Sequence, residues 1–348
     1  MTVAAFMAVA VPRAVVRTDQ PTFRAETTIV EISAVVTQDG EPVKDLSKAE
    51  VQVLDNGVAQ ELVAFDFVDL SVNTTGGTPP RRDFVAVVDD LGISVRHSSQ
   101  VIGVLQFLLR LLGREDRLAI VNTGPHELVM QLTTDRGHAT RLIQRVRGQK
   151  GTMPQFERQE CHDSTVLLTV INRAARVMRG NPAERRSILV ISEGRKIFMS
   201  DPGAGRVEAC HEVRAEYDKL VAVMADTNVS IYGIDPRGLE APFPDMSGAS
   251  PGQAAAMAGR EAQARVDQMS SRYYGALGLM ASSTGGTLTT DRNDLTAGVA
   301  TMVGDSRRYY RLAYRQPDVA ADKTPRSVQV KVTRPGVDVR SRRYYVPR

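Results

Sequence analysis

The chain has 348 residues, of which 42% are hydrophobic and 24% are charged, and its formal net charge is +4. This composition is ordinary for a globular protein and excludes a mostly disordered chain, and the length allows two or three domains. No apolar stretch reaches the roughly 18 residues that a membrane-spanning helix needs. Charges of both signs are interspersed, tryptophan is absent, and no basic patch is interleaved with aromatic residues, so we expect no nucleic-acid partner.

Residues 1–20 begin with an apolar stretch that is rich in small side chains. This pattern is typical of the end of a secretory signal, and the alternative is a frayed first strand. The first interpretation predicts a protein that is secreted or held in the cell envelope.

Residues 21–72 predict part of a small β-domain. Strands are expected at 27–36, 51–54 and 58–67. The sequence Asp55-Asn56-Gly57 between the last two is a strong hairpin signal, because both central residues of such a turn need a positive φ. Residues 73–82 are polar, contain glycine and proline, and indicate a linker.

Residues 83–303 alternate between strand and helix patterns. We expect strands at 84–88, 117–122, 127–132, 187–191, 229–234 and 284–288, and helices near 95–112, 136–146, 164–178, 207–226, just before 283, and at 294–303. Short connections between such elements predict an α/β fold with a doubly wound, mostly parallel sheet. Ligands bind beyond the carboxyl ends of the strands in these sheets, and Asp89 and Asp90 directly follow the first strand.

Residues 304–348 return to a β pattern, with strands expected at 307–314, 327–332 and 337–345. Because chain termini often lie close together, these strands are expected to complete the N-terminal sandwich around an inserted α/β domain. The alternative is two separate β modules.

The two cysteines, Cys161 and Cys210, are each followed by a histidine. In an exported protein they would most simply form one disulfide. Unpaired thiols and a metal site are the alternatives, although the spacing matches no zinc-finger pattern.

Several motifs, in order along the chain, resemble von Willebrand factor A domains and the bacterial, Acidobacteria-type VWFA-related proteins. They are the strand ending in Asp89-Asp90, the loop Gly151-Thr152, the turn Ser192-Glu193-Gly194, the segments 35–57 and 231–239, Thr284-Gly285-Gly286, and the tyrosine-rich tail 305–345. The resemblance covers nearly the whole chain after about residue 20. It implies a von Willebrand A-like, Rossmann-type domain in an exported adhesion-like or protein-binding module.

The same resemblance implies a site for Mg²⁺ or Mn²⁺ at the top of the sheet. The ligands that it assigns are Asp89, Asp90, Ser94, Thr152 and Glu193. A hard divalent cation takes about six oxygen ligands, and an open position can accept a partner's carboxylate. The structural alternative is that the two aspartates cap the helix that follows them.

This sequence departs from the family's Asp-x-Ser-x-Ser motif. Counted from Asp89, the serine positions are Leu91 and Ile93; counted from Asp90, they are Gly92 and Ser94, so one hydroxyl remains. Glutamate also replaces the aspartate of the third loop. The predicted metal site is therefore either altered but working or vestigial.

We expect no enzymatic activity. Phosphate-loop, zinc-protease and serine-hydrolase motifs are absent from the sequence. A metal-assisted hydrolase built on Asp89, Asp90 and Glu193 is the weaker alternative, since no histidine is expected near these loops to act as a base. A structural cell-envelope scaffold without metal is the other, and the favoured function is binding of a protein partner.

Overall fold

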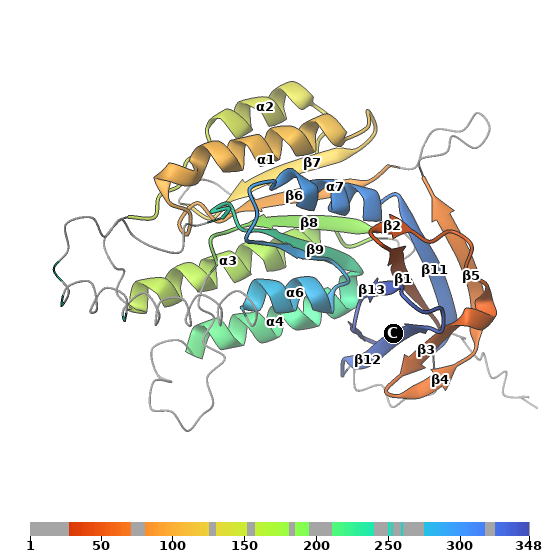
Figure 1. Ribbon diagram of the computed structural model, residues 1–348. Helices are drawn as coiled ribbons and strands as arrows, with labels where there is room; N and C mark the ends of the chain where they lie inside the picture. Colours follow the sequence, from red (N-terminus) through yellow and green to blue (C-terminus); the bar gives the residue numbers. More distant parts are fainter. Residues whose placement is uncertain are drawn as a thin grey trace, which may run out of the picture.

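The computed structural model describes residues 28–70, 81–124, 130–151, 157–180, 185–194, 211–239, 250, 252, 259, 275–316 and 324–347. They form a parallel sheet with helices on both faces, and two antiparallel sheets beside it (Figure 1). The predicted signal-like segment at residues 1–20, most of the predicted linker, Thr152 and Cys210 lie outside the described residues.

Five parallel strands form the central sheet: β6 (Asp83–Val88), β7 (Arg117–Asn122), β8 (Arg186–Ile191), β9 (Val229–Ile234) and β10 (Leu288–Thr289). Their order across the sheet is β10-β9-β8-β6-β7. Every residue of β6, β8 and β9 is buried, as expected for strands covered on both faces. The predicted α/β fold with a mostly parallel sheet is confirmed.

The described helices cover both faces of this sheet (Figure 1). One face carries α1 (Ser98–Leu111), α2 (Arg136–Gln144) and α7 (Thr296–Asp305), and the other carries α3 (Glu157–Val177), α4 (His211–Thr227) and α6 (Ala276–Ser283). Successive side chains of a strand point to opposite faces. Phe84, Ala86 and Val88 therefore join the α1 core, while Val85 and Val87 join the α3 core.

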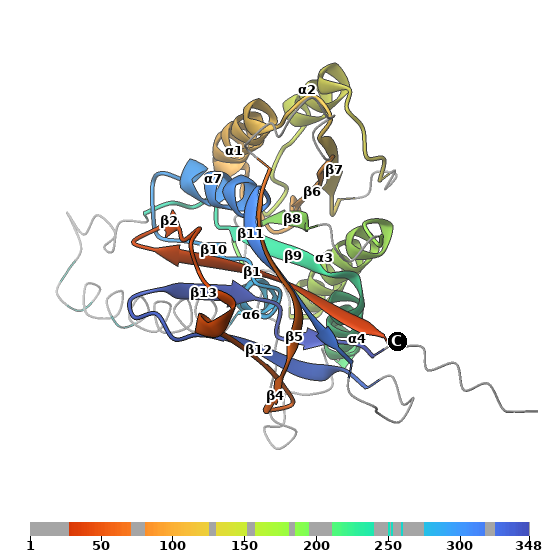
Figure 2. The same cartoon turned by 90° about the vertical axis from the view of Figure 1, so that its right-hand side faces the viewer.

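The remaining strands form a β-sandwich from both ends of the chain (Figure 2). One sheet has the order β13-β1-β11-β5 and the other β14-β12-β3-β4. The strands are β1 (Ile29–Gln38), β2 (Glu41–Pro42, paired with β1), β3 (Val51–Asp55), β4 (Val58–Gln60), β5 (Leu62–Asp69), β11 (Arg308–Arg315), β12 (Arg326–Val332), β13 (Asp338–Ser341) and β14 (Tyr344–Tyr345), and the 3-10 turn η1 (Lys48–Glu50) precedes β3. N-terminal β1 pairs with C-terminal β11 and β13, and β3 pairs with β12.

The hairpin predicted at Asn56-Gly57 joins β3 to β4, with φ values of 46° and 82° at its two central residues. The prediction of a single strand at 58–67 is wrong, because the chain leaves one sheet after β4 and enters the other at β5. The prediction of one strand at 337–345 is wrong for the same reason, since β13 and β14 belong to different sheets. Within the strand predicted at 127–132, residues 130–132 are not a strand, although Thr133 makes an isolated bridge with Leu118.

The sandwich contacts the α/β part at the amino-terminal ends of the parallel strands. Val346 N–H donates to Ala225 O, just before β9, and Arg343 N–H donates to Ser283 O at the end of α6. Arg340 of β13 forms a bidentate ion pair with Asp305, the last residue of α7, at 2.6 and 3.0 Å. The carboxyl ends of the parallel strands consequently lie at the far end from the sandwich (Figure 1).

Candidate functional site

The central sheet has one topological switch point, between β6 and β8. From β6 the chain goes to β7 on one side, and then to β8, β9 and β10 on the other. Loops leaving neighbouring strands on the two sides of such a point diverge, which opens the crevice where α/β sheets bind ligands. Asp89 and Asp90 follow β6, and Ser192 and Glu193 follow β8, so four side chains lie at this point.

Asp90 holds the loop after β7. Its Oδ1 accepts hydrogen bonds from the Thr123 N–H at 2.8 Å, the Thr123 hydroxyl at 2.9 Å and the Gly124 N–H at 2.7 Å. Its Oδ2 accepts from Nε2 of Gln149 at 2.6 Å. Asp90 is 1% exposed, so these four donors take the place of water around the carboxylate.

Asp89 links the loops after β6 and β8. One carboxylate oxygen accepts from the Ser192 hydroxyl at 2.7 Å, and the other accepts from the Gly92 N–H at 3.1 Å. The helix-capping alternative is wrong for both aspartates, because these donors lie in loops, and neither Ser94 before the 3-10 turn η2 (Val95–His97) nor His97 before α1 makes a side-chain cap.

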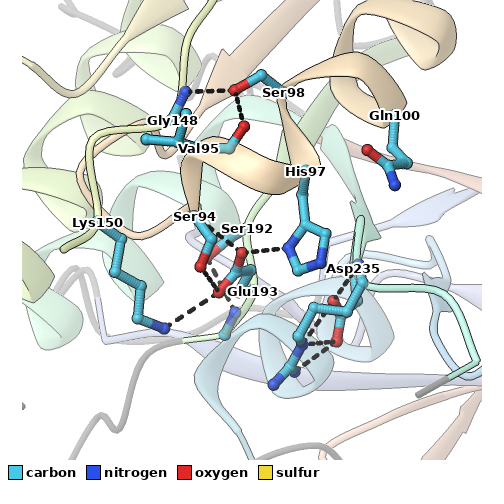
Figure 3. Close-up of polar contacts among 12 residues, drawn as sticks. Ser94, Val95, His97, Ser98, Gln100, Gly148, Lys150, Ser192, Glu193 and Asp235 are labelled. Carbon is cyan, nitrogen blue, oxygen red and sulfur yellow. Dashed lines mark hydrogen bonds and ion pairs between the residues drawn. The ribbon is translucent and has the colours of Figure 1, made fainter. Parts of the chain in front are cut away.

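Glu193 is surrounded by donors from two other segments of the chain, residues 94–97 and Lys150 (Figure 3). Its Oε1 lies 2.7 Å from the Ser94 N–H and 2.6 Å from Nδ1 of His97. Its Oε2 lies 3.1 Å from Nζ of Lys150 and 3.4 Å from the Ser94 hydroxyl. The Glu193 side chain is 3% exposed, whereas that of Lys150 is 37% exposed. The lysine therefore brings a positive charge from the surface to a buried carboxylate.

The pKa of Glu193 reflects this environment. Burial alone would raise it, because burial disfavours the charged form. The hydrogen bonds from His97 and Ser94 and the positive charge of Lys150 outweigh burial and hold the pKa of Glu193 below its usual value. Glu193 is consequently a carboxylate at neutral pH.

Backbone hydrogen bonds join the loop after β6 to the segment before α3. Gln149 N–H donates to Asp90 O at 2.7 Å, and Lys150 N–H donates to Ile93 O at 3.0 Å. A Cβ on Gly148 would lie 2.3 Å from Ile93 O, so only glycine permits this close approach. The joined loops fix the position of Lys150 beside Glu193.

The described residues do not fit a divalent-cation site. The carboxylates of Asp89, Asp90 and Glu193 already accept hydrogen bonds from the protein, and the hydroxyl of Ser94 points to Glu193. An ammonium beside Glu193 would also repel a second cation. Within the described ranges, no three His, Cys, Asp or Glu side chains form a group that could hold a metal ion.

Two residues of the site were missed from the sequence. The sequence predicts no histidine near these loops, yet the ring of His97 contacts Glu193. Lys150 belongs to none of the motifs that the sequence offers. Their signal is position alone: His97 lies three residues after Ser94, and Lys150 lies two residues before Thr152. A fourth acid at this edge, Asp235 after β9, binds Arg237 at 2.5 Å.

Cys161 of α3 is disulfide-bonded, and Cys210 is the only other cysteine in the sequence. The sulfur of Cys161 is therefore neither an unpaired thiol nor a thiolate ligand for a metal. None of the helices in the described ranges combines the length and apolarity that crossing a membrane requires.

No protein-family model and no curated protein matches the chain. Among solved structures, it is similar to an aerotolerance-related membrane protein from Bacteroides fragilis NCTC 9343, with a TM-score of 0.37 and 12% identity over 65% of this chain and 98% of that one. The PilB minor pilin from Streptococcus sanguinis gives a TM-score of 0.32 and 7% identity over 67% and 62% of the two chains. The human COPII-coat protein Sec24c gives 0.34 and 8% over 76% and 44%. The chain spans less than two thirds of the pilin and of the coat protein. Similarity at this level assigns neither a family nor an activity.

Proposed function

We propose that this chain is an exported protein-binding module with a von Willebrand A-like domain, and that its partner binds at the carboxyl edge of the parallel sheet. The observation that carries the proposal is the switch point between β6 and β8, because polar side chains from several loops converge there. The β-sandwich contacts the opposite edge of the sheet.

The disulfide of Cys161 supports export. Disulfides persist in oxidising surroundings such as the cell exterior and the bacterial periplasm, and they are rare in the cytosol. The apolar start of the chain agrees with this location, since it has the composition of a secretory signal.

A hydrolase is the second candidate, and the short contact between His97 and Glu193 favours it, because a carboxylate commonly orients a catalytic histidine. Such a site also needs a nucleophile or a water near the other ring nitrogen. No hydroxyl or thiol hydrogen-bonds to Nε2 of His97 in the described part of the chain. Partner binding therefore remains the proposed function.

The test is site-specific photo-crosslinking in cells that produce the protein. A photo-reactive residue at Val95, which is 49% exposed beside the site, is compared with one at Val58, which is 64% exposed at the far end of the sandwich. We expect a discrete protein adduct from position 95 that is absent from position 58. Adducts at position 58 only would favour the scaffold function, and no adduct at either position would contradict partner binding.

A further inference from the structure

Two described segments beside the buried acids Asp89, Asp90 and Glu193 carry exposed basic side chains. Asp89, Asp90 and Glu193 are each at most 5% exposed. Residues 94–100 and 144–151 lie side by side next to these acids, joined by the bridge between Ser94 and Lys150 and by the hydrogen bond from the Gly148 N–H to the Ser98 hydroxyl. These two segments contain no acidic residue and four basic ones, Arg96, Arg145, Arg147 and Lys150, which we call the basic rim.

Members of the basic rim face solvent. The three arginines are exposed, and Lys150 is partly exposed. An ammonium group has three N–H donors, and Glu193 uses one of those on Lys150. Lys150 can thus hold Glu193 and contact a further carboxylate or water at the same time.

We propose that Lys150 supplies, from within the chain, the positive charge that the resemblance assigns to a divalent cation, and that the basic rim binds an acidic segment of a protein partner without metal. This inference rests on the proposed function and deepens it by naming the chemistry of the partner. A carboxylate of the partner contacts the Lys150 ammonium directly, and the three arginines add attraction around it.

An acidic protein fits the basic rim better than a nucleic acid does. Specific nucleic-acid interfaces are larger and more strongly basic, and single strands are bound by stacking on aromatic rings. The two segments of the rim contain no aromatic residue apart from His97, which is buried. Val95 adds an exposed apolar side chain of the kind found in protein interfaces.

The inference is tested with a fluorescent poly-glutamate peptide and the full chain, in the presence of a chelator. We expect saturable binding that salt weakens and that Lys150→Met weakens about fivefold, the effect of roughly 1 kcal/mol. Arg147→Gln removes a rim charge without touching Glu193 and is expected to weaken binding as well. Lys331→Met, at an exposed position of β12, is the matched control and should leave binding unchanged.

The inference is overturned if the peptide does not bind, or if Lys150→Met and Arg147→Gln bind it as tightly as the wild type does. It is also overturned if the peptide binds only after Mg²⁺ or Mn²⁺ is added. Tighter binding of a single-stranded oligonucleotide through the same residues would overturn it as well. Failure here is distinguishable from failure of the proposed function. A crosslink at position 95 without peptide binding would support partner binding at this edge but contradict an acidic partner. Peptide binding without a crosslink would support the binding property of the basic rim but contradict a protein partner in the cells tested.

Discussion

Glu193 is a buried carboxylate that depends on donors from other segments of the chain. Its side chain is 3% exposed, and it contacts both His97 and Lys150. A charge buried in this way is retained only when partners replace the water it has lost. The cluster of Glu193, His97 and Lys150 therefore explains why the loops at this edge are held close together.

The substitution Glu193→Gln tests whether the buried charge of Glu193 stabilises the fold. The amide keeps the shape of the side chain and loses its charge, so we expect the free energy of unfolding at neutral pH to fall by about 1–3 kcal/mol. The folded-state pKa of Glu193 lies below its usual value. Its contribution is thus fully present above the unfolded pKa of about 4.3 and is lost as pH falls through the folded pKa.

Urea denaturation of the wild type and of Glu193→Gln, from neutral pH to below the pKa of Glu193, measures the difference in their free energies of unfolding. The two stability curves should converge as the pH drops below about 4. A difference that stays constant over the whole range would contradict an ionised, compensated Glu193.

The acids of the site could be predicted from the sequence, while their partners could not. A valine-rich run ending in two aspartates predicts a buried strand and places the aspartates at its carboxyl end, which needs only local pattern. Contacts of Glu193 with Lys150 and His97 depend on how three loops pack. No spacing in the sequence carries that information.

At the scale of elements, the site depends on the contact between the loop after β6 and the segment before α3. Gly148 lies at the closest approach, where a Cβ would come within 2.6 Å of Ser94 O as well as near Ile93 O. The two segments are joined there by the backbone bonds of Gln149 and Lys150.

Gly148→Ala should separate these segments. We expect faster hydrogen exchange at the Gln149 and Lys150 amides and weaker binding of the acidic peptide, because Lys150 is displaced from Glu193. Gly103→Ala in α1 is the matched control: a Cβ there meets nothing within 4 Å, and alanine is the better helix former. Equal exchange in the two variants would mean that the contact does not position Lys150.

Element positions were largely predictable, and the errors occur where a strand changes sheets. β7 and β9 match their predicted ranges because buried strands of a parallel sheet are uninterrupted apolar runs. Residues 58–67 contain no glycine or proline to mark a break, and local pattern cannot show that β4 and β5 pair with different partners.

In the whole molecule, the sandwich and the α/β part are joined by a buried polar cluster. Asp305 accepts from Arg340 and from the Tyr232 hydroxyl at 2.7 Å, and that hydroxyl accepts from Arg185 at 2.9 Å. Burial raises the pKa of Tyr232 well above its usual value, so this hydroxyl stays protonated. The cluster connects β13, α7, β9 and the residue before β8.

Arg340→Leu removes one of the two arginines of this cluster and leaves Asp305 buried without its ion-pair partner. Breaking a buried pair in this way costs about 3–5 kcal/mol. We expect one cooperative unfolding transition for the wild type and a lower midpoint, or two separate transitions, for the variant in differential scanning calorimetry. An exposed pair, Arg311 with Asp66, gives the control: Arg311→Leu should change the midpoint little. Equal effects of the two variants would contradict the coupling of the two parts.

We propose that an internal lysine, rather than a divalent cation, compensates the buried Glu193 at the proposed binding edge. Calorimetric titration of the chelator-treated protein with Mn²⁺ tests it most directly, with Glu193→Gln as the comparison. No saturable heat is expected for the wild type. Saturable heat that Glu193→Gln abolishes would contradict it, because Glu193 would then be a metal ligand.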